Sequence, residues 1–204
     1  MTKRCFDITV AWLGLLFLSP LLFVVFLAIY ATEGRPVFFR QRRIGWKGRP
    51  FTMYKFRTMR IARNTESGSF DAGDGSRVTR LGQVLRKTKL DELPQLWNVL
   101  RGDMSLVGPR PEVEQWVGLY PHRWAKVLQV RPGVTDPASI VYRDEERLLG
   151  QAADPLQTYR QHVLPHKLTL YEEYVATRTF WRDLRIIAQT LLAVVWPRAG
   201  KEPL

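Results

Sequence analysis

The sequence has few of the residues that build disulfides and metal centres. Its 204 residues include a single cysteine, Cys5, which excludes an intramolecular disulfide and a zinc site made of several thiols. The three histidines, His122, His162 and His166, lack the pairwise spacing of a metal motif. Internal repeats and long low-complexity tracts are also absent. The length is that of one ordinary domain, with enough residues to bury a hydrophobic core.

Acidic residues are the second shortage. Nineteen Asp and Glu oppose 31 Lys and Arg, which gives a formal net charge of +12. Such an excess predicts an anionic partner: a nucleic acid, a phospholipid surface or a phosphorylated substrate. The stretch "LGQVLRKTKLDELPQL" is compatible with the helix-turn-helix of a nucleic-acid-binding protein. That class of protein would leave the long uncharged segment described next unexplained, so we expect no nucleic acid partner.

The 24 residues from Ile8 to Ala31 carry no charge. As a straight helix they would extend about 36 Å, enough to cross a bilayer core of about 30 Å. The run is long for the hydrophobic region of a signal peptide, and no clear small-x-small cleavage site follows it. A simple membrane anchor is one interpretation of this segment.

The pair Ser19-Pro20 at the centre of the run suggests another interpretation. Pro20 has no N–H and pushes against the carbonyl of Leu16, so we expect a kink there. The Ser19 hydroxyl can hydrogen-bond a nearby carbonyl and lower the cost of a free backbone group in lipid. Each arm is then about 16 Å long, roughly half of the hydrocarbon thickness.

The charges on both sides of the run favour a helix that enters and leaves the same leaflet. Lys3 and Arg4 precede it, and the segment from Gly34 to Thr65 has ten Lys and Arg and no acid. The positive-inside bias would hold both flanks on the cytoplasmic face. We therefore expect a re-entrant membrane helix over residues 1–33 and a cytoplasmic domain over 34–204. The second flank is the more basic, so an ordinary span with the N-terminus outside stays open.

The rest of the chain predicts an α-rich α+β domain with a minor β-hairpin. Turn signals at Gly45 and Lys47-Gly48 interrupt short β-like runs, which indicates one hairpin. We expect loops over 64–77 and 131–140. The last segment, 180–197, is apolar at helical spacing but too short to span, so it is a core helix or an amphipathic interfacial one. Further helices are expected over 79–89, 94–100, 112–120, from 121 onward, 155–163 and 165–177.

Two adjacent carboxylates, Asp91 and Glu92, lie between a cationic segment and a proline-led apolar one. Acids in that place commonly cap a following helix. If capping is their only role, the protein is a membrane-anchored scaffold without catalytic activity. In a helix, however, the two side chains diverge by about 100°, so one can act while the other positions it or binds metal. A helix N-terminus and the nearby cations Arg86, Lys87 and Lys89 would favour the ionised form of Asp91.

The downstream "VGPRP" places Arg110 between two prolines, where a rigid turn presents a planar phosphate-binding fork. Carboxylates, guanidinium groups and a membrane segment together suggest phosphoryl chemistry on a lipid.

Seven motifs run through nearly the whole chain: "KRCFD", Ser19-Pro20, "PVFFRQRRIG", "FTMYKFRTM", "LRKTKLDELPQLWNVLRGDMSLVGPRP", "RPGVT" and "WRDLRIIAQT". With these motifs the chain resembles the bacterial sugar transferase family, the small monotopic polyprenyl-phosphate phosphoglycosyl transferases. The resemblance implies that the serine-proline break makes the helix re-entrant, that Asp91 is the nucleophile, and that Glu92 is its partner. It also implies that Arg86, Pro109 and Arg110 line the nucleotide-phosphate site.

The mechanism implied by the resemblance has a covalent intermediate. Asp91 would attack the β-phosphorus of a UDP-sugar and release UMP, and a polyprenyl (undecaprenyl) phosphate would then accept the phosphosugar. Mg²⁺, with Asp91 as a ligand, would bridge carboxylate and diphosphate. The implied location is the cytoplasmic face of the bacterial inner membrane, against anionic phospholipid, in a glycoconjugate or polysaccharide pathway. A homodimer is left open.

Some residues keep two interpretations. Lys55 and Arg57 of "KFRTM" either bind lipid phosphate or headgroups, or pack at the interface with their charged ends in water. Asp183 is expected to be a structural ion-pair partner. After "RPGVT" many family members continue with Gly and a Gln-Val segment, whereas this chain has Asp136 and Pro137. Because such a loop would touch the sugar, the sugar's identity is left open.

Overall fold

The computed structural model describes residues 2–61 and 77–196. Helices dominate it, and the β structure consists of two small two-stranded sheets. The predicted α-rich α+β class with a minor hairpin is therefore confirmed. The loop predicted over 64–77 lies, except for Arg77, outside the described residues.

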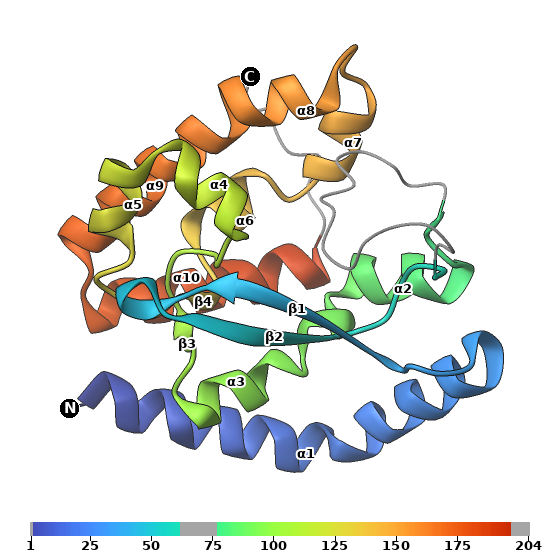
Figure 1. The fold of residues 1–204 in the computed structure, drawn as a ribbon. Helices are drawn as coiled ribbons and strands as arrows, with labels where there is room; N and C mark the ends of the chain where they lie inside the picture. The colour runs from blue at the N-terminus through green and yellow to red at the C-terminus, as the bar shows by residue number, and fades with distance from the viewer. Residues whose placement is uncertain (1, 62–76, 197–204) are drawn as a thin grey trace.

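The N-terminal helix α1, Thr2–Glu33, is continuous through Ser19 and Pro20. The Ser19 hydroxyl donates to the carbonyl of Leu16 at 2.7 Å, the same carbonyl that an N–H at position 20 would have used. Figure 1 shows that α1 runs along one side of the molecule and bends near its middle. The proline thus bends this helix without ending it.

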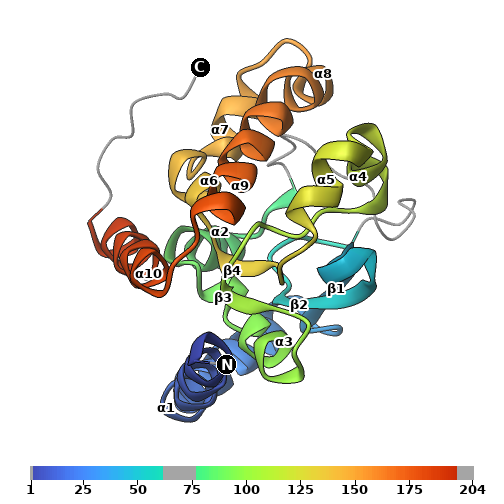
Figure 2. The same ribbon diagram turned by 90° about the vertical axis from the view of Figure 1, so that its left-hand side faces the viewer.

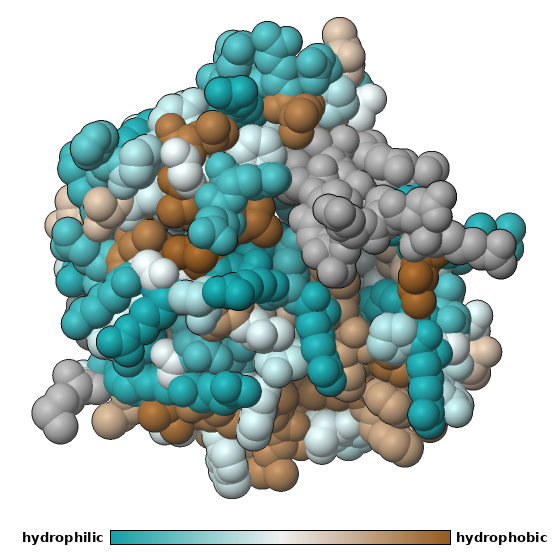
Figure 3. All heavy atoms as spheres, viewed as in Figure 1, coloured by the Kyte–Doolittle hydropathy of each residue, from teal (hydrophilic) through white to brown (hydrophobic). Residues whose placement is uncertain are grey.

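One face of α1 is apolar and exposed. By length and composition this helix could cross a membrane, and only 11% of its apolar window is buried. The brown spheres along the lower edge of Figure 3 lie where Figure 1 places α1. The opposite face packs on the domain through Ala11, Val25 and Ile29. Its large exposed side chains include Trp12, Leu16, Phe17, Phe23 and Val24.

Polar contacts join the N-terminal end of α1 to the rest of the protein. Lys3 donates to the carbonyl of Val107 at 3.1 Å and pairs with Asp183, as predicted for that acid. The adjacent Arg4 donates to the carbonyl of Val99 at 2.7 Å, and one turn further Asp7 accepts a 2.8 Å hydrogen bond from the Ser105 hydroxyl.

The C-terminal end of α1 is held as well. Arg57 donates through Nη2 to the carbonyl oxygens of Glu33 at 2.6 Å and Gly34 at 3.0 Å. A cation at the end of a helix satisfies carbonyls that have no partner within the helix. Both ends of α1 are therefore attached to the same folded unit.

The predicted hairpin is formed by β1, Phe38–Ile44, and β2, Pro50–Phe56, in an antiparallel pair. Its turn places Lys47 and Gly48 at φ values of 56° and 72°, as the glycine signal indicated. The hairpin lies between α1 and the helices of the C-terminal half (Figure 1).

Two helices follow close to the predicted boundaries. Helix α2, Arg80–Thr88, starts at Thr79, whose side chain accepts from the amide of Gly82 at 2.9 Å. A Cβ on Gly82 would lie 2.1 Å from the Thr58 carbonyl oxygen, so only glycine lets this turn touch the segment after β2. Helix α3, Gln95–Arg101, packs against α1.

The prediction of a loop over 131–140 is wrong. The segment contains β4, Gly133–Thr135, which pairs in parallel with β3, Ser105–Val107. It also contains α6, Pro137–Val141, whose N-cap Asp136 accepts from the amide of Ser139 at 2.9 Å. A three-residue strand and a five-residue helix are too short to leave a periodic pattern in the sequence.

The C-terminal half is a group of helices, of which α9, Leu164–Thr177, lies on the side opposite α1 (Figures 1 and 2). The last helix, α10, Phe180–Val195, buries Asp183 and Ile186 and exposes Trp181, Leu191 and Leu192. The others are α4 (Glu114–Leu119), α5 (Pro121–Val127), α7 (Glu145–Gly150), α8 (Pro155–Thr158) and the π-helical turn η4 (Tyr159–Val163).

Candidate active site

A cavity of about 1770 Å³ lies between the end of α1, the hairpin and the C-terminal helices. Its wall near α1 is apolar and includes Phe26, Leu27 and Tyr30. Asp91 and Glu92 line its middle, and side chains of α6 and α9 line the end away from α1.

A tight turn places the two carboxylates. Lys89 ends α2 with a φ of 58°, and a 3₁₀ turn, η3, Leu90–Glu92, follows directly. Neither acid caps a helix, because the N-cap of α3 is Pro94 and no side chain accepts a hydrogen bond there. Both carboxylates are buried, with 6% and 9% of Asp91 and Glu92 exposed. The capping explanation is therefore wrong for this pair.

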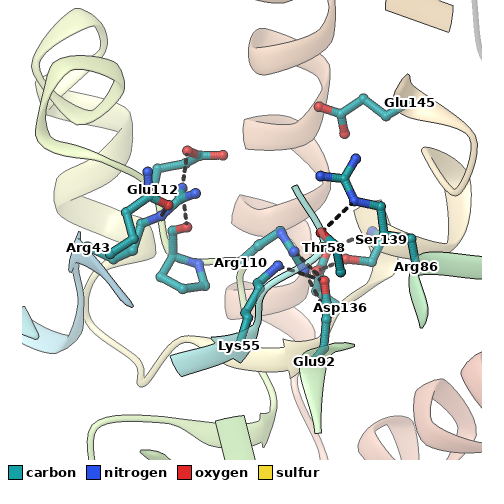
Figure 4. Close-up of polar contacts among 12 residues, drawn as sticks. Arg43, Lys55, Thr58, Arg86, Glu92, Arg110, Glu112, Asp136, Ser139 and Glu145 are labelled. Carbon is teal, nitrogen blue, oxygen red and sulfur yellow. Dashed lines mark hydrogen bonds and ion pairs between the residues drawn. The ribbon is translucent and has the colours of Figure 1, made fainter. Parts of the chain in front are cut away.

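Glu92 is neutralised by two cations, as Figure 4 shows. Its Oε1 accepts hydrogen bonds from Nζ of Lys55 at 2.9 Å and from Nη2 of Arg110 at 2.6 Å. Its Oε2 accepts one from Nη1 of Arg110 at 3.3 Å. Burial acts to raise the pKa of Glu92, but Arg110 and Lys55 outweigh it and hold that pKa well below its usual value. Glu92 is thus a carboxylate at neutral pH.

Burial has the opposite consequence for the lysine. It lowers the pKa of Lys55 to about 8, even though Glu92 favours the charged form. Lys55 therefore carries its charge at neutral pH and loses it in mildly alkaline solution.

Asp91 is in a different environment from its neighbour. Its Oδ1 is buried without a hydrogen-bond partner. Burial raises its pKa, Lys55 opposes this, and the charge of Glu92 adds to it. The sequence led us to expect that Arg86, Lys87 and Lys89 would favour the ionised form of Asp91. Lys89 does lower the pKa of Asp91, whereas Arg86 binds the Thr58 hydroxyl at 3.0 Å and Glu146 at 2.7 Å.

The other predicted site residues are only partly brought together. Arg86 and Arg57 line the cavity with Lys55 and Arg110. Arg57 keeps Nε and Nη1 buried without partners while Nη2 holds the end of α1. Pro109 is not part of the lining, and its carbonyl accepts from the amide of Gly133 at 3.0 Å. Its part is to fix the backbone beside Arg110.

Glu112 is a lining residue that the sequence reasoning missed. It is buried and accepts from Nη1 of Arg43 and the Tyr159 hydroxyl, both at 2.8 Å. The only signal for it in the sequence was its position two residues after Arg110, because its partners come from distant segments.

Asp136, which the sequence placed in the loop expected to touch the sugar, is fully buried near Arg110 and does not line the cavity (Figure 4). Burial raises the pKa of Asp136.

Asp91 suits one kind of metal site. The described residues contain no group of three or more His, Cys, Asp or Glu side chains that could enclose an ion. Mg²⁺ is commonly held by one or two carboxylates together with substrate phosphates and water. The unpartnered Oδ1 of Asp91 fits that pattern, whereas the oxygens of Glu92 are taken by Lys55 and Arg110.

Comparison with known proteins identifies a family for this chain. The family model for bacterial sugar transferase matches residues 1–197. The chain is 44% identical to the uncharacterized sugar transferase EpsL of Bacillus subtilis, over 95% of this chain and 87% of that protein. It is 37% identical to the UDP-glucose:undecaprenyl-phosphate glucose-1-phosphate transferase of Caulobacter vibrioides, over 94% and 68% of the two chains.

A further relative is named for a different sugar. It is the UDP-N-acetylgalactosamine-undecaprenyl-phosphate N-acetylgalactosaminephosphotransferase of Aeromonas hydrophila, 36% identical over 95% of this chain and 43% of that protein. Relatives of similar identity are thus named for glucose and for N-acetylgalactosamine.

The Glu92 cluster yields a stability prediction. Arg110→Met leaves Glu92 buried with Lys55 alone, so we expect the free energy of unfolding in detergent to fall by about 3–5 kcal/mol. The control is Arg101→Met, since the Arg101–Asp103 pair is half-exposed at 3.5 Å and should cost less than about 1 kcal/mol. Adding Glu92→Gln to Arg110→Met should recover part of the loss. Equal effects of the two arginine variants in thermal or denaturant unfolding would contradict this account.

Proposed function

This chain belongs to the bacterial sugar transferase family, and we propose that it transfers a sugar-1-phosphate from a UDP-sugar to undecaprenyl phosphate, with Asp91 as the nucleophile. The names of the relatives supply the donor and acceptor classes. The observation that carries the proposal is the unequal treatment of two adjacent carboxylates. Glu92 is paired with Lys55 and Arg110, while Asp91 keeps a buried oxygen without a partner.

The pairing divides the roles of the two acids. A carboxylate bound to two cations is a weak nucleophile, because its lone pairs are engaged and its basicity is low. Burial raises the pKa of Asp91, which makes its ionised form more basic and more nucleophilic. Glu92 holds Lys55 and Arg110 beside Asp91, and both cations can then attract the diphosphate of the donor.

The reaction proceeds in two displacements at one phosphorus atom. An Asp91 carboxylate oxygen attacks the β-phosphorus of the UDP-sugar, the bond from that phosphorus to the bridging oxygen breaks, and UMP leaves. A phosphate oxygen of undecaprenyl phosphate then attacks the same phosphorus and breaks the bond to Asp91. The products are an undecaprenyl diphosphate sugar and the regenerated carboxylate, so charge and atoms balance.

Asp91 would also hold Mg²⁺ through its unpartnered oxygen, together with phosphate oxygens of the substrate. The ion, when bound, supplies charge neutralisation between the anionic carboxylate and diphosphate. Lys55 and Arg110 contribute to the same neutralisation from the protein side.

The acceptor would enter from the apolar side of the cavity, beside the end of α1. Phe26, Leu27 and Tyr30 line that side, and Arg57 lies there with two buried N–H groups that lack partners. A guanidinium at the end of a membrane helix can bind a lipid phosphate at headgroup height. This favours the phosphate-binding interpretation of Arg57 over simple interface packing.

We propose that α1 is re-entrant and that the domain rests on the cytoplasmic leaflet. Its two ends are tied to one folded unit, at Lys3 and Arg4 on one side and by Arg57 on the other. A straight span would carry one end across the bilayer, away from these partners. The exposed Trp181, Leu191 and Leu192 of α10 give a second apolar surface for the same leaflet.

The first prediction from the proposed function concerns the nucleophile. Asp91→Asn keeps the side chain's size but removes the anionic oxygen, so we expect UMP release to fall by about 10³-fold or more. Wild-type protein quenched with UDP-sugar and no acceptor should show the mass of a sugar phosphate on Asp91, and the variant none. Asp103→Asn, outside the cavity, should behave as wild type. Continued product formation without any adduct on residue 91 would exclude the covalent route.

The second prediction concerns pH. Lys55 loses its charge as the pH passes about 8, so kcat/KM for UMP release should decline on the alkaline side with an apparent pKa near that value. Lys55→Arg keeps the charge at these pH values and should move the decline to higher pH. Lys47→Arg, on the exposed hairpin turn, should leave it in place. An alkaline decline that is identical in Lys55→Arg would rule out Lys55 as its cause.

The third prediction concerns topology. In a Cys5→Ala background, Thr2→Cys and Arg49→Cys place one thiol at each flank of α1. A re-entrant helix predicts that a membrane-impermeant thiol reagent labels neither from outside intact spheroplasts and both after permeabilisation. Labelling of residue 2 alone in intact spheroplasts would establish a straight span.

A further inference from the structure

The end of the cavity away from α1 contains a buried hydroxyl group with no partner. Tyr171, on α9, is 1% exposed, lines the cavity, and its hydroxyl makes no hydrogen bond. Neighbouring hydroxyls are satisfied: that of Tyr159 donates to Glu112 at 2.8 Å, and that of Tyr142 lies 2.7 Å from Nδ1 of His166. Because a buried hydroxyl without a partner lowers stability, its presence at a cavity points to a ligand that completes it.

Tyr171 and the two carboxylates line the same cavity. Arg110, which binds Glu92 directly, is among the charged groups that act on Tyr171, together with Asp136, Glu112 and Glu145. Burial and the three acids raise the pKa of Tyr171, and Arg110 opposes them. The phenol therefore stays protonated and can donate a hydrogen bond.

Aromatic rings and a fixed ion pair complete this end of the cavity. Lys167 is 4% exposed, pairs with Glu145, and lies 5.2 Å from the centre of the Tyr159 ring and 5.8 Å from that of Tyr142. A sugar presents apolar C–H faces to rings and hydroxyls to polar side chains, so these surroundings suit a glycosyl group.

We propose that the α6–α9 end of the cavity is the subsite for the donor's sugar, and that the Tyr171 hydroxyl selects among sugars by donating to one of their oxygens. This rests on the proposed function. The sugar is bonded to the phosphate that Asp91 attacks, so it must lie beside the carboxylates. The uracil is separated from that phosphorus by a second phosphate and a ribose, and so lies farther away.

The subsite gives a physical reason for specificity within the family. A site built to hydrogen-bond a sugar hydroxyl rejects an epimer that leaves the protein group unpaired. Tyr171 is a specificity residue in this sense, and Asp91 and Glu92 do not depend on it for their own contacts.

The test uses the full chain in detergent and two matched variants on one helix. Tyr171→Phe and Tyr174→Phe each remove one buried phenolic oxygen from α9. The Tyr174 hydroxyl is satisfied by Asp183 at 2.7 Å and by the Val107 carbonyl at 3.2 Å, and Tyr174 does not line the cavity. Calorimetric affinities for UDP and a panel of UDP-sugars, including the glucose, galactose and N-acetylgalactosamine forms, are measured in an Asp91→Asn background, where no adduct forms. UMP release and thermal unfolding are measured alongside with Asp91 intact.

We expect Tyr171→Phe to weaken binding of the preferred UDP-sugar by about tenfold, to narrow the preference over its epimer, and to leave UDP affinity unchanged. Its unfolding temperature should be unchanged or higher, because no hydrogen bond is lost. Tyr174→Phe should unfold at a lower temperature and keep the wild-type sugar preference.

Other outcomes overturn the subsite. If Tyr171→Phe lost affinity for UDP and for the UDP-sugar equally, this end of the cavity would bind the nucleotide. Unchanged affinities and preference in Tyr171→Phe would make the hydroxyl a structural feature, with the proposed transfer reaction still intact. Wild-type protein that neither binds any UDP-sugar nor releases UMP would remove the proposed function, and the subsite with it.

Discussion

The buried carboxylate of Glu92 joins three distant parts of the chain. Glu92 lies in the turn between α2 and α3. It accepts hydrogen bonds from Lys55 of β2 and from Arg110 in the segment after β3. A buried charge costs several kcal/mol unless it is neutralised, so the hairpin, the turn and the Arg110 segment must converge. Their convergence forms the middle of the cavity and places Asp91 there with an oxygen that no protein group uses.

The attachment of α1 places one end of the cavity beside the end of this apolar helix. Lys3, Arg4 and Asp7 fix one end of this helix, and Arg57 fixes the other. Because Arg57 also lines the cavity, the end of the apolar helix and the site share a residue. On the proposed function, this arrangement lets a lipid phosphate reach the carboxylates without leaving headgroup height.

The cavity has two chemically different ends, and the carboxylates lie between them. Phe26, Leu27 and Tyr30 line the end near α1, whereas Lys167 and Tyr171 line the end near α9. In the proposed reaction the lipid acceptor would enter from the apolar end, and the sugar bonded to the reacting phosphorus would lie toward the other end.

The sequence by itself determined the uncharged run, the hairpin, most helices and the central motif, because each is set by local periodicity, turn residues or adjacent charges. It contained no sign of β4 and α6, which are too short for a pattern, and it assigned Arg86 to Asp91, whereas Arg86 binds Thr58 and Glu146. Only the tertiary structure decided that Lys55 and Arg110, 37 and 18 residues away, neutralise Glu92 and leave Asp91 with a free oxygen. Two neighbours in sequence differ in environment because burial and ion pairing depend on which distant segments reach each side chain.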